Sequence, residues 1–333
     1  MTQGDEQTQT AGRPAAGRLA AVTGVTGFIG GHLAGELARR GWRVRALVRS
    51  MPRWHGIEPA PAGAGPIELV LGSLADTRAL GALVEGADAV VHLAGAIRGR
   101  GPADFMRANA EGTGALARAW AQEASGARFV LVSSLAAREP GLSAYAASKR
   151  AAEDRLRAAG GRGPWQILRP AAVYGPGDRE TLGIFRAARG PVQPVLGAAG
   201  ARLALVHVAD LVRAIIAALE AELEPGVHEV TDARHAGYAW AEIAAAAAAA
   251  LGRPSRPFRV PAPLIRGLGL AGDLTARLGS APMLTSGKAR EILHADWGSS
   301  PQRQLPPAIW QPRLPIDQGF AETVAWYRKA GWL

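Results

Sequence analysis

A glycine-rich turn near the start of the chain constrains the fold more than any other feature. The segment from Thr23 to Gly30 contains Gly-x-x-Gly-x-x-Gly, follows a short apolar run at 19–23 and precedes helical spacing at 28–40. Residues 43–48 then alternate like a strand, which completes a βαβ unit. With 42 glycines the bare pattern arises by chance roughly 0.6 times, so its position between strand and helix carries the meaning. There, glycines let a pyrophosphate approach amides at a helix N-terminus.

Strand and helix signals continue to alternate after this unit. Strands are expected at 67–71, 89–93, 128–133 and 165–168, and helices at 77–85, 103–123 and 143–158. Such alternation predicts a parallel sheet with helices on both faces. We therefore expect an α/β fold, a Rossmann-type doubly wound parallel sheet with a smaller, partly helical C-terminal substrate lobe.

The chain divides where the alternation loosens after Pro170. Residues 1–17 are predicted to be a disordered tail, and 18–173 a Rossmann domain that binds NAD(P) and to which 203–232 returns. Residues 174–202 and 233–333 form the predicted substrate-binding lobe. Strands at 206–208 and 227–231 are expected to rejoin the main sheet, with Asp210 capping the helix between them.

Tyr145 and Lys149 stand four residues apart in a chain with only four tyrosines and three lysines. Composition alone predicts roughly 0.04 such pairs. On a helix this spacing places the phenol and the ammonium on one face, where the cation favours phenolate and lowers the pKa of the tyrosine. The pair predicts an acid–base tyrosine, and the alternative is an incidental pair on a solvated helix face.

The end of the second strand indicates which dinucleotide is bound. An acid there would bind the ribose 2′-hydroxyl of NAD, but this strand ends Val48-Arg49-Ser50 and the next acid is Glu58. A guanidinium suits a 2′-phosphate through charge-assisted hydrogen bonds. We expect NADP(H) to be favoured, with Arg49 as main ligand and Ser50 or Arg53 assisting, and NAD(H) stays open. The alternative is that Arg49 is a solvated loop residue.

Composition excludes several classes of function. The absence of cysteine removes disulfides, thiolate nucleophiles and cysteine zinc sites, and no metal is expected. The net charge of +10 invites nucleic acid, but the arginines are scattered and form no stripe with aromatic residues. No signal peptide or apolar stretch of about 18 residues is evident. We expect a cytoplasmic protein with no membrane span and no nucleic-acid partner, which takes a small-molecule substrate; a homodimer stays open.

Six further motifs follow the glycine turn in order. They are VHLAG at 91–95, NAEGT at 109–113, VSS at 132–134, YAASK at 145–149, LRPAAVYGPG at 168–177 and VHVAD at 206–210. Together with the turn they resemble the extended branch of the short-chain dehydrogenase/reductase superfamily, also described as the NAD-dependent epimerase/dehydratase family. The resemblance covers nearly the whole chain after residue 18.

The resemblance implies catalytic roles for four residues. It implies that Tyr145 is the acid/base, that Lys149 binds the nicotinamide ribose and lowers the pKa of Tyr145, and that Ser134 holds the substrate oxygen. Ser133 matches the family pattern less well than Ser134. Asn109 matches the asparagine that the family places near the ribose and the lysine.

The resemblance also implies a set of cofactor-binding residues, with one departure. The family carries an acid that contacts adenine after the third strand, whereas this chain has Gly72-Ser73-Leu74, in which Ser73 retains one hydrogen-bonding group. The expected cofactor-binding residues are Gly24, Thr26, Gly27, Phe28, Ile29, Gly30, Arg49, Ser50, Ser73, Leu74, Leu93, Ala94, Gly95, Tyr145, Lys149, Pro170 and Val173.

Three functions fit this resemblance. The first is an NAD(P)(H)-dependent oxidoreductase that moves a hydride between nicotinamide and a ketone or secondary alcohol of a small hydrophobic or conjugated substrate. The second is a nucleotide-sugar epimerase or dehydratase, and the third is a non-catalytic scaffold or redox sensor related to a complex I subunit. Many sugar-nucleotide enzymes have an asparagine where this chain has Pro170, Ala171 and Ala172, and residues 169–178 resemble dihydroflavonol reductases and 3β-hydroxysteroid dehydrogenases. The first function is therefore favoured.

Other polar residues carry less information. His92, His207 and His228 lie on predicted strands without a second ligand at metal-binding spacing, so structural roles are expected. Arg98 and Arg100 follow the fourth strand, where this architecture places its cleft. Solvated loop charge is the favoured interpretation of these arginines, and contact with an anionic substrate is the alternative.

Overall fold

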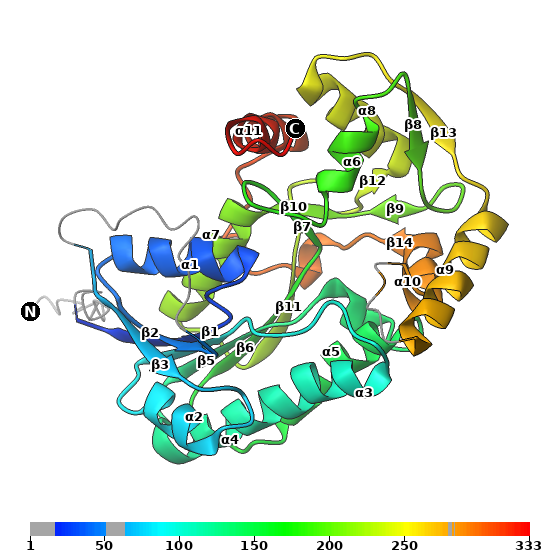
Figure 1. Ribbon diagram of the computed structural model, residues 1–333. Coiled ribbons are helices and arrows are strands. Elements are labelled where there is room, and N and C mark those ends of the chain that lie inside the picture. The colour runs from blue at the N-terminus through cyan, green and yellow to red at the C-terminus, as the bar shows by residue number, and fades with distance from the viewer. Residues whose placement is uncertain (1–16, 51–63, 279–281, 283) are drawn as a thin grey trace, which may run out of the picture.

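A parallel seven-stranded sheet forms the centre of the computed structural model, which describes residues 17–50, 64–278, 282 and 284–333. The expected tail, apart from Gly17, lies outside the described residues, as do Arg53 and Glu58. The sheet has the order β11-β6-β5-β4-β1-β2-β3 (Figure 1). Its strands are β1 (Leu19–Thr23), β2 (Arg43–Val48), β3 (Ile67–Leu71), β4 (Ala89–His92), β5 (Arg128–Val132), β6 (Trp165–Pro170) and β11 (Gly226–Val230).

The strand order confirms the predicted doubly wound sheet. From β1 the chain builds outward through β2 and β3, and it then returns to place β4 on the other side of β1. All neighbouring strands of this sheet are parallel, so their carboxyl ends meet at one edge. The reversal between β1 and β4 creates the crevice in which such sheets bind ligands.

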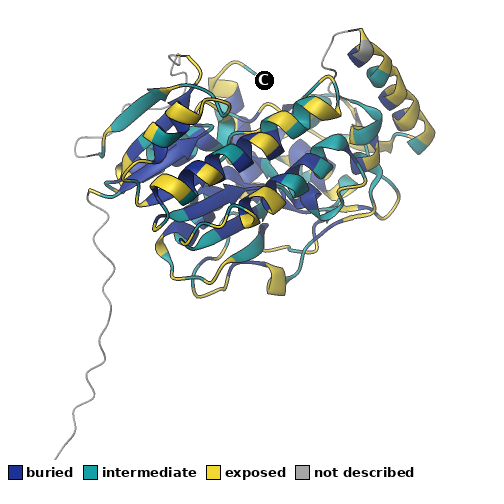
Figure 2. Ribbon diagram, turned by 90° about the horizontal axis from the view of Figure 1, so that it is seen from below, coloured by how far each residue is buried: buried dark blue, intermediate teal, exposed yellow. Residues whose placement is uncertain are grey.

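Helices cover both faces of the sheet, and each face has its own core (Figure 1). One core joins Leu37 of α1 (Phe28–Arg39) to Ile215 of α7 (Val208–Glu220). The other joins α2 (Thr77–Val84), α4 (Gly112–Glu123) and the start of β5, and includes the fully buried Trp120. Each such buried side chain contributes about 1.5–3 kcal/mol to folding. Figure 2 shows the sheet and the inner helix faces as the buried interior.

The helix expected at 103–123 is one continuous rod of three segments, two α-helical and one π-helical. It begins as α3 (Pro102–Phe105), widens into the π-helix η1 (Met106–Glu111) and continues as α4. Periodicity does not reveal this widening, which contains Asn109, whose hydrogen bonds are described below. Single π turns inside α-helices occur frequently at functional sites.

A smaller lobe lies beside the carboxyl edge of the sheet (Figure 1). Its short strands pair as β7 with β10, β8 with β13, and β9 with both β12 and β14. The strands are β7 (Ala172–Tyr174), β8 (Val192–Val195), β9 (Arg202–Leu203), β10 (Leu205–His207), β12 (Tyr238–Ala239), β13 (Arg256–Arg259) and β14 (Asp296–Trp297). The helices are α5 (Ala144–Arg157) under the main sheet, and α6 (Leu182–Ala187), α8 (Trp240–Leu251), α9 (Ala262–Arg277), α10 (Ser286–Leu293) and α11 (Ile316–Lys329) in or against the lobe, with 3-10 turns η2 (Leu135–Arg138) and η3 (Pro301–Arg303).

Two local predictions around α7 are wrong. The strand expected at 206–208 is present as β10, but it pairs with β7 and only β11 joins the main sheet. His207, and not Asp210, caps α7, because its Nδ1 accepts the N–H of Ala209. Asp210 lies inside the first turn, where its carboxylate accepts the N–H groups of Arg313 and Leu314. It thereby ties the segment before α11 to the main sheet.

No helix within the described ranges has both the length and the hydropathy needed to cross a bilayer.

Candidate active site

The glycine turn packs tightly between β1 and α1. Gly24 has a φ of +80°, and a Cβ there would lie 2.7 Å from the backbone nitrogen of Ala94. A Cβ on Gly30 would collide with the carbonyl oxygen of Gly24, so the start of α1 rests directly on the turn. Within the described residues no side chain caps the helix at Gly27, which leaves the N–H groups of its first turn and the positive end of its dipole for an anion. This geometry fits the pyrophosphate of a dinucleotide.

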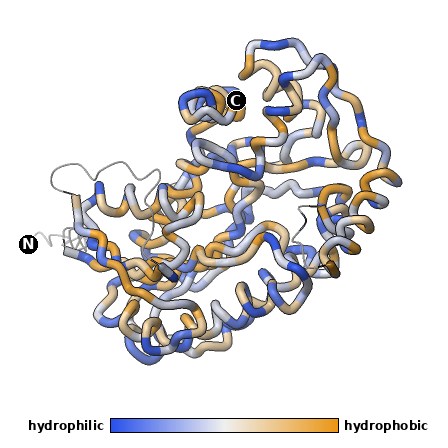
Figure 3. The backbone as a smooth tube through the Cα atoms, viewed as in Figure 1, coloured by the Kyte–Doolittle hydropathy of each residue, from blue (hydrophilic) through white to orange (hydrophobic). Residues whose placement is uncertain are grey.

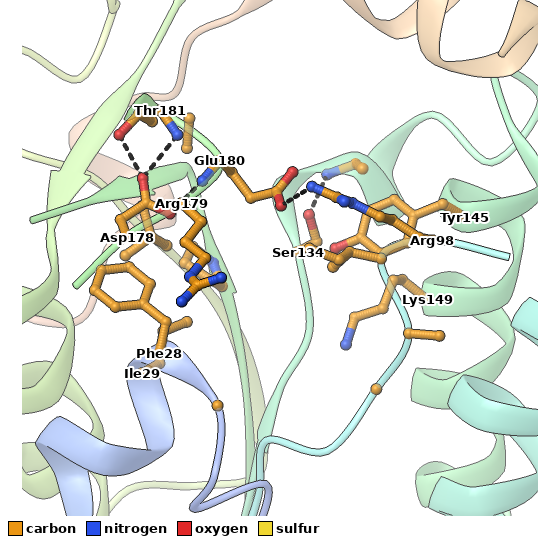
Figure 4. A pocket seen from close by; sticks show the side chains of 18 of the residues that line it. Phe28, Ile29, Arg98, Ser134, Tyr145, Lys149, Asp178, Arg179, Glu180 and Thr181 are labelled. Atoms are coloured by element: carbon orange, nitrogen blue, oxygen red, sulfur yellow. Dashed lines mark hydrogen bonds and ion pairs between the residues drawn. The ribbon is translucent and has the colours of Figure 1, made fainter. Parts of the chain in front are cut away.

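A cleft of about 2440 Å³ runs from this turn to the smaller lobe. It brings together most of the residues that the sequence predicts for cofactor binding and catalysis, several of which Figure 4 shows on its two sides. These lining residues are Gly24, Thr26, Gly27, Phe28, Ile29, Gly30, Leu93, Gly95, Asn109, Ser134, Tyr145, Lys149, Pro170 and Val173.

Two predicted cofactor residues lie apart from the cleft, at the end of β2. Arg49 and Ser50 are exposed and directly precede residues 51–63, which lie outside the described part of the chain. Their position after the second strand is the one expected for contacts to the adenosine ribose.

Three more predicted cofactor residues do not line the cleft. The hydroxyl of Ser73 accepts the N–H of Ala75 at 3.3 Å and so stabilises its own loop. Leu74 packs into the core beneath the sheet. The backbone N–H of Ala94 donates to Thr23 Oγ1 at 3.2 Å, which joins the ends of β4 and β1. These contacts shape the crevice from outside.

Tyr145 lies in the first turn of α5, beside Ser134 on the same side of the cleft (Figure 4). The turn is fixed because the hydroxyl of Ser143 accepts the N–H of Ala146 at 2.9 Å. Burial raises the pKa of Tyr145 to about 12, a hydrogen bond with Ser134 lowers it in part, and the charge of Glu291 raises it further. Desolvation of the phenolate is the largest cause of this shift and Lys149 is not among its causes, so the lowering of this pKa by Lys149 stays a prediction.

Lys149 is held one turn further along α5. Its Nζ donates to the carbonyl oxygen of Val132 at 2.9 Å, which directs the ammonium to the end of β5. Burial lowers the pKa of Lys149 to about 8, and the charge of Glu153 partly opposes this shift. Lys149 also acts with burial to lower the pKa of His92 to about 3, so His92 is neutral near pH 7. A charge placed in the cleft would therefore change the fraction of Lys149 that is protonated near pH 7.

The two neighbouring serines have different partners. Ser133 is buried and donates to Glu153 Oε1 at 2.7 Å, so its hydroxyl is engaged beneath the sheet edge. Ser134 accepts the N–H of Ala136 at 3.2 Å and contacts the Tyr145 phenol. A hydroxyl that accepts at its oxygen keeps its proton for a substrate oxygen. The arrangement supports Ser134 over Ser133 as the polarising serine.

Asn109 joins three parts of the cleft wall from the π-helical turn. Its Nδ2 donates to Ser148 Oγ at 2.8 Å and to the carbonyl of Ala96 at 3.0 Å, while its Oδ1 accepts the N–H of Ala96 at 2.7 Å. Ser148 in turn donates to the carbonyl of Tyr145 at 2.7 Å. Asn109 therefore acts as a positioning residue for the loop after β4 and for α5. Sequence reasoning missed Ser148, whose signal is a serine between the tyrosine and the lysine.

A buried ion pair beneath the cleft was also missed from sequence. Glu153 has no exposed side-chain surface and accepts from Arg169 Nε at 2.8 Å and Nη2 at 2.6 Å. The hydroxyl of Ser133 donates a third hydrogen bond to the Glu153 carboxylate. The available signal was the spacing of Glu153 four residues after Lys149, on the same face of α5. With Ser133, this pair connects α5, which carries Tyr145 and Lys149, to β6 and to the segment after β5 that carries Ser134.

The remaining polar predictions are placed as follows. Arg98 pairs with Glu180 at 2.5 Å across the cleft, so its charge is engaged by protein, as Figure 4 shows. His92 lies between Thr23 and Thr113 at 2.7 and 2.9 Å. The side chains of His207 and His228 are also hydrogen-bonded within the fold. In the described ranges, no group of three histidine, aspartate or glutamate side chains could hold a metal ion.

Together, the switch-point crevice, the uncapped glycine turn and the Ser134–Tyr145–Lys149 set define a dinucleotide-binding oxidoreductase. The chain belongs to the NAD dependent epimerase/dehydratase family, whose model matches residues 20–230. This match confirms the resemblance to extended short-chain dehydrogenases/reductases.

Known proteins of two kinds resemble the chain. Ceramide reductase of Caulobacter vibrioides is 45% identical over 322 residues, which cover 95% of this chain and 96% of that protein. Among solved structures, MoeE5 in complex with UDP-glucuronic acid and NAD covers 94% of this chain and 99% of its own, at 23% identity and a TM-score of 0.66. UDP-glucose 4-epimerase of Thermotoga maritima covers 94% and 99%, at 20% identity and a TM-score of 0.69. The two structures show the shared fold, and the chain is an oxidoreductase of this NAD-dependent family.

Proposed function

We propose that this chain reduces the ketone of a ceramide-type lipid, an N-acylated long-chain amino ketone, to its secondary alcohol. The observation that carries the proposal is the 45% identity with ceramide reductase across 95% of the chain. A ceramide has a secondary hydroxyl beside its acylated amine, and this hydroxyl is what hydride transfer to a ketone would form. The proposal thereby narrows the hydrophobic ketone substrate expected from the sequence to an N-acylated long-chain amino ketone.

The proposed chemistry adds one hydride and one proton across a carbonyl group. A reduced nicotinamide, when bound, supplies the hydride to the carbonyl carbon. Ser134 donates a hydrogen bond to the carbonyl oxygen, and Tyr145 gives that oxygen a proton as the C=O π bond breaks and the C–H bond forms. A pKa of about 12 keeps Tyr145 protonated near pH 7, which suits a proton donor in the reductive direction. Lys149 adds positive charge beside the resulting phenolate.

The cleft wall on the side of the smaller lobe supports a lipid substrate. Beyond Tyr145 the lining includes a set of aliphatic and aromatic side chains that suits alkyl chains, alongside charged residues. Pro170, Ala171 and Ala172 add no amide or charge where many sugar-nucleotide enzymes have an asparagine. The apolar lining residues of the lobe are Ile184, Leu196, Leu203, Trp240, Ala276, Pro282, Leu284, Ile292, Trp297, Trp326 and Trp332.

The test is turnover by the purified full chain with NADPH and an N-acyl long-chain amino ketone in detergent micelles. We expect NADPH to be consumed and the secondary alcohol to appear by mass spectrometry. The same head group with a short acyl and a short alkyl chain is the matched control, and it should react with a lower kcat/KM because it buries less apolar surface. Turnover of a UDP-sugar with NAD, and none of the lipid ketone, would overturn the proposal.

We also propose that NADP(H) is preferred over NAD(H), through Arg49. At the end of β2 this chain has the exposed guanidinium of Arg49 in place of the acid that selects a ribose 2′-hydroxyl. Ser50 adds a hydrogen-bond donor for a 2′-phosphate. Arg49→Asp should weaken NADPH binding about 10-fold to 100-fold, the loss of a charge-assisted contact of about 1.5–3 kcal/mol, and should favour NADH. Nicotinamide fluorescence titrations measure both constants.

The control for this substitution is Arg162→Asp, an exposed arginine in the loop before β6, at the opposite edge of the sheet. It changes the net charge equally and should leave the NADPH to NADH ratio unaltered. Equal ratios for wild type and Arg49→Asp would refute the assignment of Arg49 as the phosphate ligand.

One observation favours a nucleotide-sugar substrate as the second candidate. Arg179, Lys288 and Arg290 line the cleft on the lobe side, where cations could meet a diphosphate. However, Lys288 already pairs with Glu291 at 3.0 Å, and Arg290 Nε donates to the carbonyl of Leu142 at 2.7 Å. Lys288 is thus paired within α10, and Arg290 joins α10 to the segment before α5, which leaves less charge for a diphosphate.

A further inference from the structure

Helix α9 presents its apolar side to solvent. Leu264, Leu268, Leu270 and Leu274 are each more than half exposed, and Leu278, directly after the helix, is 87% exposed. We call these five residues the leucine face. Figure 2 shows exposed residues along this projecting helix, and Figure 3 shows its apolar stretches at the outer edge of the lobe. A surface helix normally turns polar residues outward.

The opposite side of α9 is already covered by protein. Ile265, Gly269 and Ala276 are buried, and a Cβ on Gly269 would lie 2.9 Å from the carbonyl oxygen of Thr285 at the start of α10. These buried positions are spaced by four and by seven residues, about one and two helical turns, and therefore form one stripe. The leucine face is thus not needed for packing within the lobe, and its five side chains require another environment.

The segment that leads into the leucine face, and α9 itself near its start, carry positive charge. Arg253, Arg256, Arg259 and Arg266 are all exposed, and the sequence from 252 to 272 contains no acid. The first acid, Asp273, accepts the N–H of Ser286 at 3.1 Å and so is engaged toward α10. Phe258, between two of these arginines on β13, is 56% exposed. Leucines with an exposed aromatic residue and flanking arginines match the surface of a bilayer that contains anionic lipid.

The same helix also borders the cleft. Asp273 and Ala276 of α9 line it, as do Pro282 and Leu284 in the segment that follows. An α-helix with its side chains is only about 10–12 Å across, so a surface docked on the leucine face lies one helix diameter from the cleft. A substrate could pass between them without crossing the aqueous phase.

We propose that the leucine face docks on an anionic lipid bilayer as an interfacial helix, and that the cleft takes its substrate from that bilayer. The second half of this statement rests on the proposed lipid ketone, whereas the first rests on α9 and its arginines alone. A second copy of the chain would fit less well, because self-association through this face would bring like arginine charges together.

Flotation with phosphatidylcholine vesicles, with and without phosphatidylglycerol, tests the docking step without any turnover. The full chain should float with the phosphatidylglycerol vesicles, and Leu268→Ser combined with Leu274→Ser should reduce its partition about 10-fold to 100-fold. The control is Leu71→Ser, since Leu71 is 59% exposed on β3, far from α9 in the chain, and should float like wild type. Wild type that stays unbound, or a double variant that floats equally well, would overturn the proposal.

A second pair of variants tests the charge. Arg256→Glu with Arg259→Glu should weaken flotation, with the largest effect at low salt, whereas Arg162→Glu should not. A wild-type dimer in sedimentation that the double leucine variant converts to monomer, with no vesicle binding, would assign the face to a second copy instead.

Comparison of assay formats separates this proposal from the proposed function. The double leucine variant should retain turnover of the lipid ketone in micelles and lose it on vesicles. Flotation without turnover in either format would retain the docking and reject the substrate, whereas equal turnover by wild type and variant on vesicles would reject delivery from the bilayer.

Discussion

Tyr145→Phe is expected to lower kcat for ketone reduction by about 10²-fold to 10⁴-fold, the usual worth of a positioned proton donor. The phenol lies in the cleft with Ser134, and its pKa of about 12 makes it a proton donor near pH 7. Phenylalanine keeps the ring and its contact with Phe105, whose centroid lies 6.2 Å away. NADPH affinity, measured by nicotinamide fluorescence, should therefore change little.

Tyr174→Phe is the matched control for this substitution. Tyr174 is fully buried, lies outside the cleft lining, and its hydroxyl has no hydrogen-bond partner within the described part of the chain. Removal of that hydroxyl should leave kcat unchanged. If Tyr145→Phe retained wild-type turnover, or if both variants lost it equally, Tyr145 would not be the proton donor.

The fold follows from sequence because its signals are local. Strands of a parallel sheet are buried on both faces, so β1 and β4 read as short apolar runs, each ahead of a turn or loop. The glycine turn can be predicted from sequence because two of its positions require glycine. Gly24 has a left-handed backbone, and Gly30 packs against the carbonyl oxygen of Gly24 with no room for a side chain. Most of the predicted cleft residues inherit their positions from this scaffold.

The features that sequence did not reveal depend on partners distant in the chain. A strand signal at β10 does not identify its neighbour, and β7, with which it pairs, lies about 30 residues earlier in the chain. The pKa of Tyr145 could not be predicted from Lys149 four residues away, because its largest determinant is desolvation by the surrounding fold. The leucine face could not be predicted, because the hydrophobicity of the α9 sequence does not show which side of the helix packs against the rest of the protein.

Glu153→Ala is expected to lower the free energy of unfolding by about 3–5 kcal/mol, since it leaves the buried charge of Arg169 without its partner. Chemical denaturation followed by circular dichroism measures the loss. Asp154→Ala is the control: it removes the next carboxylate, which is 62% exposed and pairs with Arg157 at the surface, at a cost of about 0–1 kcal/mol.

Changing both partners tests whether the unpaired charge causes this loss. Glu153→Met combined with Arg169→Met removes the two charges together, and should recover much of the stability lost in Glu153→Ala, because apolar side chains of similar volume can replace a buried pair. A double variant as unstable as the single one would mean that the hydrogen bond from Ser133 to Glu153, at 2.7 Å, holds α5 against β5 instead. Either result bears on catalysis, because Lys149 and Tyr145 occupy the same helix and move with it.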